Sequence, residues 1–413
     1  MSSIDRADRR LLRPAPHARR LPALERIAST ILERALTHLE GGTLEVRLPG
    51  SSKVRRFGSG PPVTMAIHDR RFFRRVATRG KVGVGESYTA GEWDSDDLVS
   101  LFELLLRNAA VAAERHARVR RLLEARPRLN TRNGFLRARR NIAYHYDLGN
   151  DLFQLMLDET MTYSGAVFER PDDLLADAQR RKYQRICRKL QLRPGDRVLE
   201  IGCGWGGFAA FAAREHGCSV TGLTISAEQA ALARNRTAGL DVRILEEDYR
   251  GHEGSYTKVA SIEMLEAIGE RQFPTYFEAI DRLLEPGGLA CIQTILIPDD
   301  RWDRYRRAPD WIEQYVFPGC LIPSLTALTQ AMTRCSPLMV HEVDEIGPHY
   351  AETLRRWRAS FRENIGEVRR LGYDERVERT WNFYLAFCEA AFRTRALRDV
   401  QLTLTRPFNE VLA

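Results

Sequence analysis

The residues best placed to do chemistry follow one apolar run near the middle of the chain. Val198–Ile201 has the pattern of a buried strand and carries the acidic Glu200, and the turn that follows includes Gly202 and Gly204. Glycine lets the backbone turn sharply and lets a ligand approach it without meeting a Cβ. A helical pattern begins at Phe208, and a helix N-terminus offers unpaired N–H groups. This order predicts a nucleotide-type site at the carboxyl end of a parallel strand, with a simple packing turn as the alternative.

Alternating strand and helix patterns continue along the chain after this turn. Strands are expected at Val220–Thr224, Val242–Leu245, Val259–Ile262 and Leu289–Ile295, and helices at Ala227–Asn235, with Ser226 as N-cap, and at Phe273–Leu284. Such alternation implies an α/β fold with a parallel sheet and right-handed crossovers. Polar or acidic residues follow one strand after another, which is where an open α/β sheet binds its ligand.

The chain has no G-x-x-x-x-G-K-[ST] motif for gripping a triphosphate. It combines an acidic residue before the glycine turn, an acidic residue after a later strand, and Pro286-Gly287-Gly288 before the fifth strand. This combination resembles the class I S-adenosylmethionine (SAM) methyltransferases. The resemblance implies a Rossmann-like sheet and SAM as the cofactor.

Several longer motifs narrow the resemblance to one family. They are Tyr144–Asp151 (YHYDLGND), Thr162-Tyr163-Ser164, Glu200–Gly207 (EIGCGWGG), Gly222–Gln229 (GLTISAEQ), Glu263–Gly269, Tyr315–Gly319 and Phe387–Arg393. Together they resemble the cyclopropane-fatty-acyl-phospholipid synthases and the related mycolic acid methyltransferases, over about the last two-thirds of the chain. The resemblance implies helical insertions that form an acyl pocket beside the Rossmann-like sheet, and an unsaturated phospholipid as substrate.

The same resemblance assigns roles to individual residues. The expected cofactor contacts are Tyr163, Ser164, Glu200, Gly202, Gly204, Thr224, Gln229, Asp248 and Tyr249. Asp248 and Tyr249 follow the third strand, where the family contacts adenine, and Glu200 would orient the glycine turn or the methionine amine. Tyr146, Tyr315 and Phe317 are candidates for lining the acyl pocket and facing a cation, with ordinary core packing as the alternative for each.

The base is the point at which the chain departs from the family. In that family, a bound bicarbonate takes the proton and is held by a Cys, a Glu, a His, a Tyr and a backbone amide. Only the Glu is matched plainly, by Glu266, because Gly165 stands for the Cys, Gln293 for the His, and Arg358 lies near the Tyr position. We therefore expect Glu266 to be the base or an anion anchor, with Gln293 as a hydrogen-bonding partner. Binding of bicarbonate is left open.

The expected reaction follows from the electrophilic methyl group of SAM. Methyl transfer to a carbon–carbon double bond leaves a cation on the acyl chain, and a base then removes a proton from the new methyl group as a cyclopropane closes. A methylene or methyl branch is the alternative product on the same substrates.

Length and composition suggest how the chain is divided. A chain of 413 residues is expected to hold two or three domains. We expect a disordered tail at 1–20, a small α+β domain at 21–110, an arginine-rich linker at 111–140 and the catalytic domain at 141–413. The second segment is similar to the extra domain of the bacterial synthases, which is lipid-associated in that family.

Charge and cysteine usage indicate partners and location. The net charge is +8, and arginines gather between Arg115 and Arg140, which suits an anionic membrane surface or nucleic acid, with a solvated helix face as the alternative. There is neither a membrane-spanning run nor a signal peptide, so we expect a cytoplasmic protein, peripheral at the inner face of the cell membrane. Seven scattered cysteines predict reduced thiols and no metal site.

Two other function classes remain as alternatives. An RNA methyltransferase would suit the positive charge, but the chain has neither an Asn-Pro-Pro-Tyr motif nor an RNA-binding module, so no nucleic acid partner is expected. A lipid-binding protein without activity would explain the lost Cys and His, but the cofactor motifs are intact. A homodimer is left open.

Overall fold

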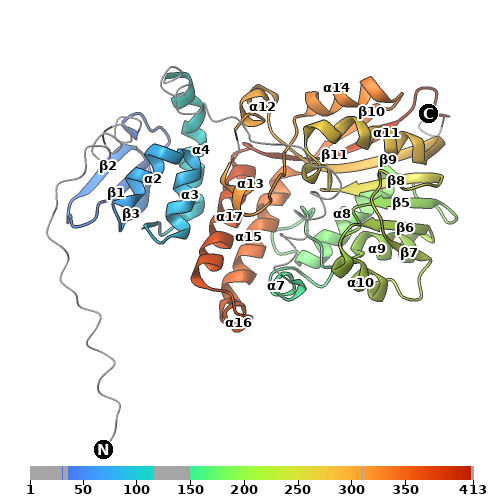
Figure 1. Ribbon diagram of the computed structural model, residues 1–413, viewed down its shortest axis with the longest axis horizontal. Coiled ribbons are helices and arrows are strands. Elements are labelled where there is room, and N and C mark those ends of the chain that lie inside the picture. The colour runs from blue at the N-terminus through green and yellow to red at the C-terminus, as the bar shows by residue number, and fades with distance from the viewer. Residues whose placement is uncertain (1–29, 31–35, 116–148, 309, 411–413) are drawn as a thin grey trace, which may run out of the picture. The chain divides into compact units, whose positions relative to one another are not determined.

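The computed structural model describes residues 30, 36–115, 149–308 and 310–410, which divide into two compact units, 1–104 and 105–413 (Figure 1). The boundary lies inside helix α4 (Leu98–Arg115), slightly before the position expected from the sequence. Residues 111–115 of the predicted linker therefore belong to a helix. The rest of that linker and the predicted tail lie outside the described residues.

The N-terminal unit is a small α+β fold, as expected. Its sheet has the order β2-β1-β3-β4, formed by β1 (Gly42–Arg47), β2 (Val54–Ser59), β3 (Pro62–Ile67) and β4 (Trp93–Asp94). Helices α2 (Arg71–Arg79) and α3 (Lys81–Thr89) pack against each other. Gly83 permits this packing, because a Cβ there would lie 2.3 Å from the carbonyl oxygen of Arg75.

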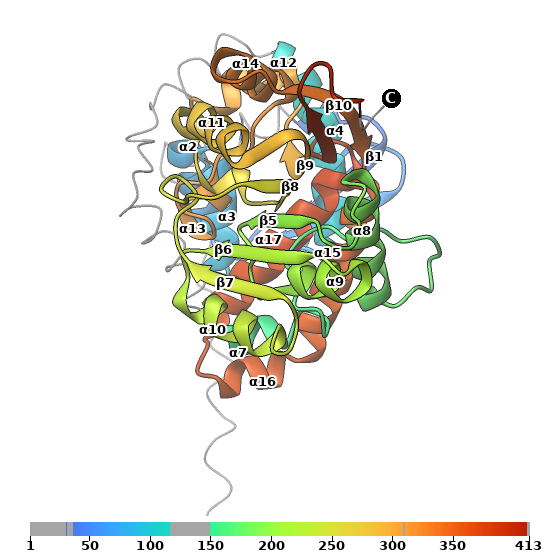
Figure 2. The same cartoon turned by 90° about the vertical axis from the view of Figure 1, so that its right-hand side faces the viewer.

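The C-terminal unit is built on a seven-stranded sheet of order β10-β11-β9-β8-β5-β6-β7 (Figure 2). Its strands are β5 (Arg197–Ile201), β6 (Ser219–Thr224), β7 (Val242–Glu246), β8 (Tyr256–Ile262), β9 (Leu284–Leu296), β10 (Met339–Glu345) and β11 (Arg398–Thr405). The strands from β5 to β9 pair in parallel, whereas β11 is antiparallel to both β9 and β10. The five predicted strands are therefore present, and two further strands close the β9 side of the sheet.

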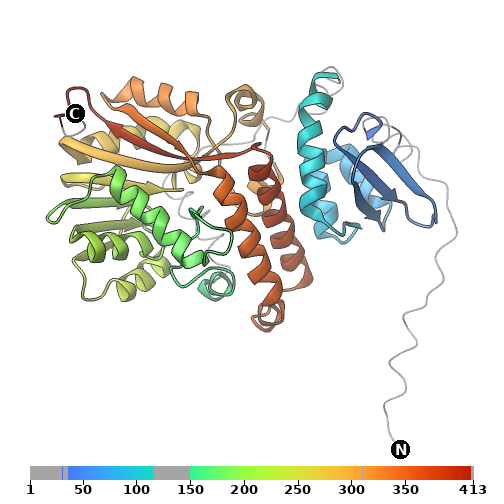
Figure 3. The same cartoon turned by 180° about the vertical axis from the view of Figure 1, so that it is seen from behind.

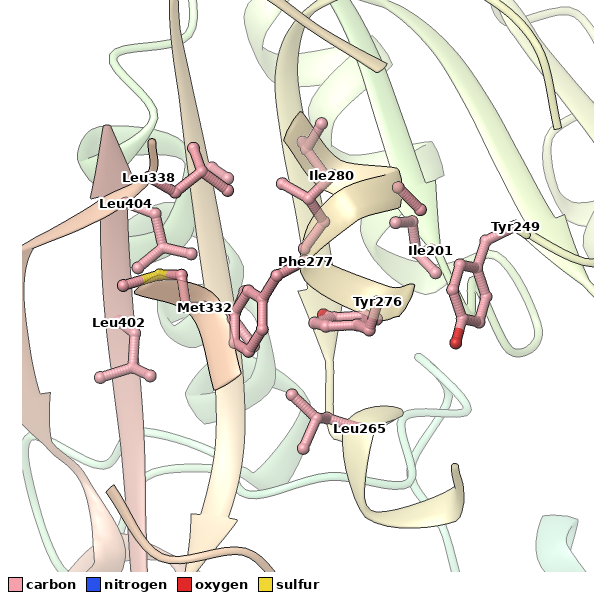
Figure 4. Packing of buried hydrophobic residues seen from close by; sticks show 14 of the residues in the cluster. Ile201, Tyr249, Leu265, Tyr276, Phe277, Ile280, Met332, Leu338, Leu402 and Leu404 are labelled. Atoms are coloured by element: carbon pink, nitrogen blue, oxygen red, sulfur yellow. The ribbon is translucent and has the colours of Figure 1, made fainter. Parts of the chain in front are cut away.

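Helices cover both faces of this sheet. They are α8 (Leu175–Lys189), α9 (Gly207–His216), α10 (Ala227–Arg236), α11 (Phe273–Leu283) and α14 (Leu325–Cys335). Successive strand residues point to opposite faces, so Val198 and Ala260 pack with α8 and α9, while Leu199 and Val259 pack with α11 and α14. Figure 4 shows the second of these layers, in which Phe277 of α11 and Met332 of α14 lie near Leu402.

The predicted turn before the fifth strand is wrong in detail. The structure continues β9 from Leu284 through Pro286-Gly287-Gly288, with a break in register between the pairs Tyr256–Leu284 and Lys258–Leu289. Glycine tolerates this irregularity, since Gly287 has a φ of +75°.

The remaining helices of the C-terminal unit gather beside the sheet. They are α7 (Asn150–Gln154), α12 (Asp299–Tyr305), α13 (Trp311–Tyr315), α15 (Gly347–Glu363), α16 (Ile365–Arg370) and α17 (Glu375–Arg393). Helices α15 and α17 run side by side (Figure 3). Aromatic residues pack between these helices and the glycine turn: Phe153 of α7 lies 5.2 Å from Trp205 and 5.8 Å from Trp381 of α17 between ring centroids. These helices are the predicted insertions.

Candidate active site

The strand order reverses between β5 and β8, and this reversal places two loops side by side. The two strands are parallel neighbours, yet the chain leaves β5 toward β6 and leaves β8 toward β9. Gly202 follows the end of β5, and Glu263 follows the end of β8. Open α/β sheets bind their ligands in the crevice at such a reversal. The glycine turn and Glu263 therefore lie at the expected binding position.

The glycine turn has the conformation and the space that a nucleotide-type ligand needs. Gly202, Gly204 and Gly206 have φ values of +81°, +51° and +79°, which side chains rarely adopt. A Cβ added to Gly204 would meet nothing within 4 Å. Gly206 is the left-handed N-cap of α9, so the first N–H groups of that helix begin directly after the turn.

Glu200 in β5 is buried beneath this turn. Burial raises the pKa of its carboxyl group well above the usual value, and the charge of Lys182 only partly offsets this. One carboxyl oxygen of Glu200 has no hydrogen-bond partner among the described residues. A buried, unsatisfied acceptor beside an open glycine turn fits a polar cofactor such as SAM.

The ends of β6 and β7 carry the other expected cofactor residues. The Thr224 hydroxyl donates to the Gln229 side-chain oxygen at 2.9 Å, and Ser226 caps α10 as predicted, accepting from the Gln229 N–H. Asp248 accepts a hydrogen bond of 2.8 Å from Arg250 Nε. The Tyr249 ring packs in the core against Tyr276, with 5.7 Å between centroids. A contact of Tyr249 with a cofactor would therefore use its backbone.

Tyr163 and Ser164 lie between the helical insertions and the sheet. The Tyr163 ring stacks on Trp357 at 5.0 Å, and its hydroxyl lies 3.1 Å from that of Tyr384. The Ser164 hydroxyl accepts a 2.6 Å hydrogen bond from Lys182 Nζ of α8. Burial lowers the pKa of this lysine to about 8.

Glu266 stands in a one-turn 3-10 helix (Leu265–Ala267) just after β8. One carboxyl oxygen accepts from the Thr294 hydroxyl at 2.9 Å and from the Ile295 N–H. The other oxygen is buried and has no hydrogen-bond partner among the described residues. Burial, and next the charge of Glu263, raise the pKa of Glu266 to about 7. A carboxyl group with a pKa near neutrality can take up and release a proton at cellular pH.

Glu263 is the centre of a buried polar cluster that the sequence analysis did not assign. Its carboxylate accepts from Gly165 N–H at 2.8 Å, from Gln293 Nε2 at 2.8 Å and from the Tyr350 hydroxyl at 2.7 Å. Gln293 Nε2 also lies 3.2 Å from a carboxyl oxygen of Asp399. Burial and the charge of Glu263 raise the pKa of Asp399 well above its usual value. An acidic residue directly after the fourth strand was the available sequence signal for Glu263, whereas Asp399 and Tyr350 carried none.

The placement of Gln293 agrees with its predicted role as a hydrogen-bonding partner, because it donates to the carboxylate of Glu263. Arg358, which lies near the expected tyrosine position, does not bond to the cluster around Glu263. Arg358 pairs with the buried Glu389 of α17 at 2.9 Å, and Tyr350, two turns earlier in α15, reaches the cluster in its place.

The three aromatic pocket candidates, Tyr146, Tyr315 and Phe317, lie in different places. Tyr146 lies outside the described residues. Tyr315 ends α13 and stacks on Trp311 with 5.7 Å between centroids. Phe317, two residues later, lies 6.3 Å from Tyr163 and 5.6 Å from Tyr384. The aromatic rings around Tyr163 are therefore those of Phe153, Phe317, Tyr384 and Trp357, which together form an aromatic wall.

This arrangement can be compared with known proteins. The family model for mycolic acid cyclopropane synthetase matches residues 135–402. The chain belongs to this family. It is 39% identical to the tuberculostearic acid methyltransferase UfaA1 of Mycobacterium tuberculosis, over 92% of this chain and 91% of that protein. It is 37% identical to the cyclopropane-fatty-acyl-phospholipid synthase of Escherichia coli K12, over 84% of this chain and 88% of that protein.

Solved structures agree with this membership. The mycolic acid cyclopropane synthase CmaA1, complexed with SAH and CTAB, matches with a TM-score of 0.60 and 31% identity, over 64% of this chain and 97% of that chain. This protein is therefore a SAM-dependent methyltransferase that acts on lipid acyl chains. Among the described residues, every helix is too short or too polar to cross a membrane.

Proposed function

We propose that this methyltransferase adds the methyl group of SAM to the double bond of an unsaturated acyl chain in a phospholipid and closes the product to a cyclopropane. The cofactor supplies an electrophilic methyl group when it is bound. The residues that would hold it are those of the glycine turn, with Glu200, Thr224 and Gln229. The observation that carries the proposal is Glu266, a buried carboxyl group just after β8 whose second oxygen has no hydrogen-bond partner among the described residues.

The chain's own residues would act on the acyl chain in two ways. Tyr163, Trp357 and Phe317 present aromatic rings, which stabilise a cation electrostatically and keep water away from it. Glu266 would accept the proton from the newly added methyl group. The electron pair of that C–H bond then forms the third side of the ring, and the carboxylate becomes a carboxylic acid.

A branched product is the second candidate, and one observation favours it. The relative matched over 92% of this chain is named a tuberculostearic acid methyltransferase. In that outcome a hydride shifts along the acyl chain before a proton is lost from the added methyl group, and a methylene branch results. A saturated methyl branch would need a further reduction of this methylene group by a separate hydride donor. The glycine turn and the aromatic wall would serve both products equally.

The proposal extends to where the reaction happens. An unsaturated phospholipid presents its double bond within a bilayer, so we propose that the enzyme works at the inner face of the cell membrane. The arginines between Arg115 and Arg140 would attract anionic headgroups.

One experiment separates these outcomes. The purified protein is incubated with SAM carrying a ¹³C-methyl group and with vesicles of a monounsaturated phospholipid, and extracted lipids are examined by mass spectrometry and NMR. Cyclopropane methylene signals support the ring. An exocyclic methylene signal supports the branch and overturns the ring. Labelled free fatty acid without labelled phospholipid would contradict the proposed substrate.

A further inference from the structure

We infer that the carboxylate of Glu263 occupies the position of an external anion in this active site, so that turnover needs no bicarbonate. The inference deepens the proposed function and rests on it. Relatives of the synthase type are expected to hold a bicarbonate between several side chains. The sequence of this chain leaves open whether it binds bicarbonate. The structure supplies a carboxylate of its own.

The first support is geometric. Two of the positions expected to surround a bicarbonate are Gly165 and Gln293, and both donate to Glu263 at 2.8 Å. The Tyr350 hydroxyl donates to the second oxygen of the same carboxylate at 2.7 Å. All three partners are donors, which is the arrangement that an ionised carboxylate requires. The donors that would hold an external anion are therefore already satisfied by Glu263.

The second support is the space around these donors. A Cβ on Gly165 would lie 2.7 Å from a carboxyl oxygen of Asp399 and 3.0 Å from the Tyr350 ring. A cysteine cannot replace Gly165 unless these groups move. Asp399 and Tyr350 are both buried, and Glu263 beside them is half-buried. The presence of Glu263 thus explains why Gly165 and Gln293 stand where the family has a Cys and a His.

The third support is charge. Lys182 is the buried cation whose charge stabilises the ionised forms of Glu263 and Asp399. Burial raises the pKa of Glu263, whereas the donors Tyr350, Gly165 and Gln293 lower it. A bicarbonate beside Glu263 would add a further negative charge next to Lys182, which already interacts with the carboxyl groups of Glu263 and Asp399. Like charges that share a buried site repel strongly, so this site disfavours a second anion.

The backbone at Glu263 is consistent with a special role. Its φ is +50°, in the left-handed region that glycine adopts readily and a long side chain adopts at a cost. Because glycine relieves this strain, Glu263→Gly removes the carboxylate without demanding a new backbone conformation. This variant opens the space that an external anion would need.

Glu263 and Glu266 then have separate tasks. Glu263 keeps its charge through the reaction and stabilises the cation that methyl transfer creates, while Glu266 takes the proton. Glu263 is in this sense a positioning residue, since its charge also raises the pKa of Glu266. Removing Glu263 should therefore shift the acid side of the pH–turnover profile to lower pH.

The test combines anion binding with turnover. Binding of ¹³C-bicarbonate is followed by NMR for the wild type and for Glu263→Gly, and turnover is measured in carbon-dioxide-free buffer with and without bicarbonate or formate. We expect no bicarbonate binding and no stimulation for the wild type. For Glu263→Gly we expect bound bicarbonate, turnover lower by ~10²-fold or more, and at least ~10-fold recovery with either anion. The exposed Glu253→Gln is the matched control and should behave as the wild type.

Other outcomes overturn the inference. Bicarbonate that binds to the wild type or stimulates its turnover contradicts it, and so does a folded Glu263→Gly variant that is fully active without an anion. If Glu263→Gly does not fold, Glu263→Gln keeps the volume filled. It should lose turnover, retain SAM binding and gain nothing from formate, and wild-type turnover in this variant refutes the assignment. If the wild type modifies no lipid, the proposed function fails, and the NMR binding comparison still decides whether Glu263 excludes the anion.

Discussion

Replacing Glu266 by glutamine should make the protein less active but more stable at alkaline pH. Burial and the charge of Glu263 raise the pKa of Glu266 from 4.5 to about 7. A rise of about 2.5 pKa units corresponds to about 3 kcal/mol, at about 1.4 kcal/mol per unit. Below pH 4.5 the carboxyl group is protonated in both folded and unfolded chains. Between pH 4.5 and 7 the unfolded chain loses this proton first, so folding stability falls as pH rises, and above pH 7 the whole penalty is present.

Glutamine removes this penalty because it carries no charge. Its oxygen can still accept from Thr294 and Ile295, but its NH₂ group replaces a buried oxygen that has no partner among the described residues. An unsatisfied buried donor costs about 1–3 kcal/mol at every pH. This cost cancels when the stability difference between variant and wild type is compared at two pH values. The difference should move in favour of the variant by about 2.5 kcal/mol between pH 5 and pH 8.

The assay is urea unfolding of both proteins at the two pH values, with Glu253→Gln as an exposed control that should stay within about 0.5 kcal/mol. Turnover of Glu266→Gln should fall by ~10²-fold or more while its affinity for SAM is retained. Turnover of the wild type should rise with pH up to about 7 and then stay constant, because Glu266 must lose its proton to act as a base. A stability difference that is the same at both pH values would refute the buried-charge argument. Turnover equal to the wild type would remove Glu266 from the mechanism.

Three further perturbations test other parts of the site. Gly204→Val places a side chain at a φ of +51°, where the ligand would lie. The affinity for SAM, measured by calorimetry, should therefore fall at least tenfold, or about 1.4 kcal/mol. Unchanged affinity in a folded variant would contradict the assignment of the SAM site to this turn. Lys182→Met removes the buried cation beside Ser164 and should cost about 3–5 kcal/mol of folding stability, measured by urea unfolding. Arg188→Met, at an exposed position on the same helix, is the control and should cost little. Equal losses of stability in the two variants would show that the buried charge is unimportant. Co-sedimentation with vesicles should weaken as salt rises and as anionic lipid is removed, by about 1 kcal/mol for each arginine neutralised between Arg115 and Arg140, and binding that ignores both would exclude these arginines.

The framework of the fold could be predicted from the sequence because its signals are local. The strands from β5 to β9 are short apolar runs, and the helices between them have recognisable starts such as Ser226. The glycine turn was recognisable for the same reason, since positive φ values at Gly202 and Gly204 follow from a turn that only glycine makes easily.

Elements stabilised by distant partners were missed. The strand β10 exposes most of its residues, and β11 is entirely enclosed between β9 and β10, so neither has the alternating pattern that marks a half-buried strand. Helix α3 was also missed, because Gly83 and Gly85 are poor helix formers whose role is to permit close contact with α2.

The sequence by itself determined the family, the cofactor and the position of the crevice, because these depend on motifs that lie within single strand–turn–helix units. Only the tertiary structure decided how the acidic residues share their work. Lys182, Glu263, Gln293, Tyr350 and Asp399 come from separate elements, and folding brings them into one buried cluster. Whether a carboxyl group there holds a charge or a proton depends on burial and on neighbouring charges, and both are properties of the packed molecule that no local pattern encodes.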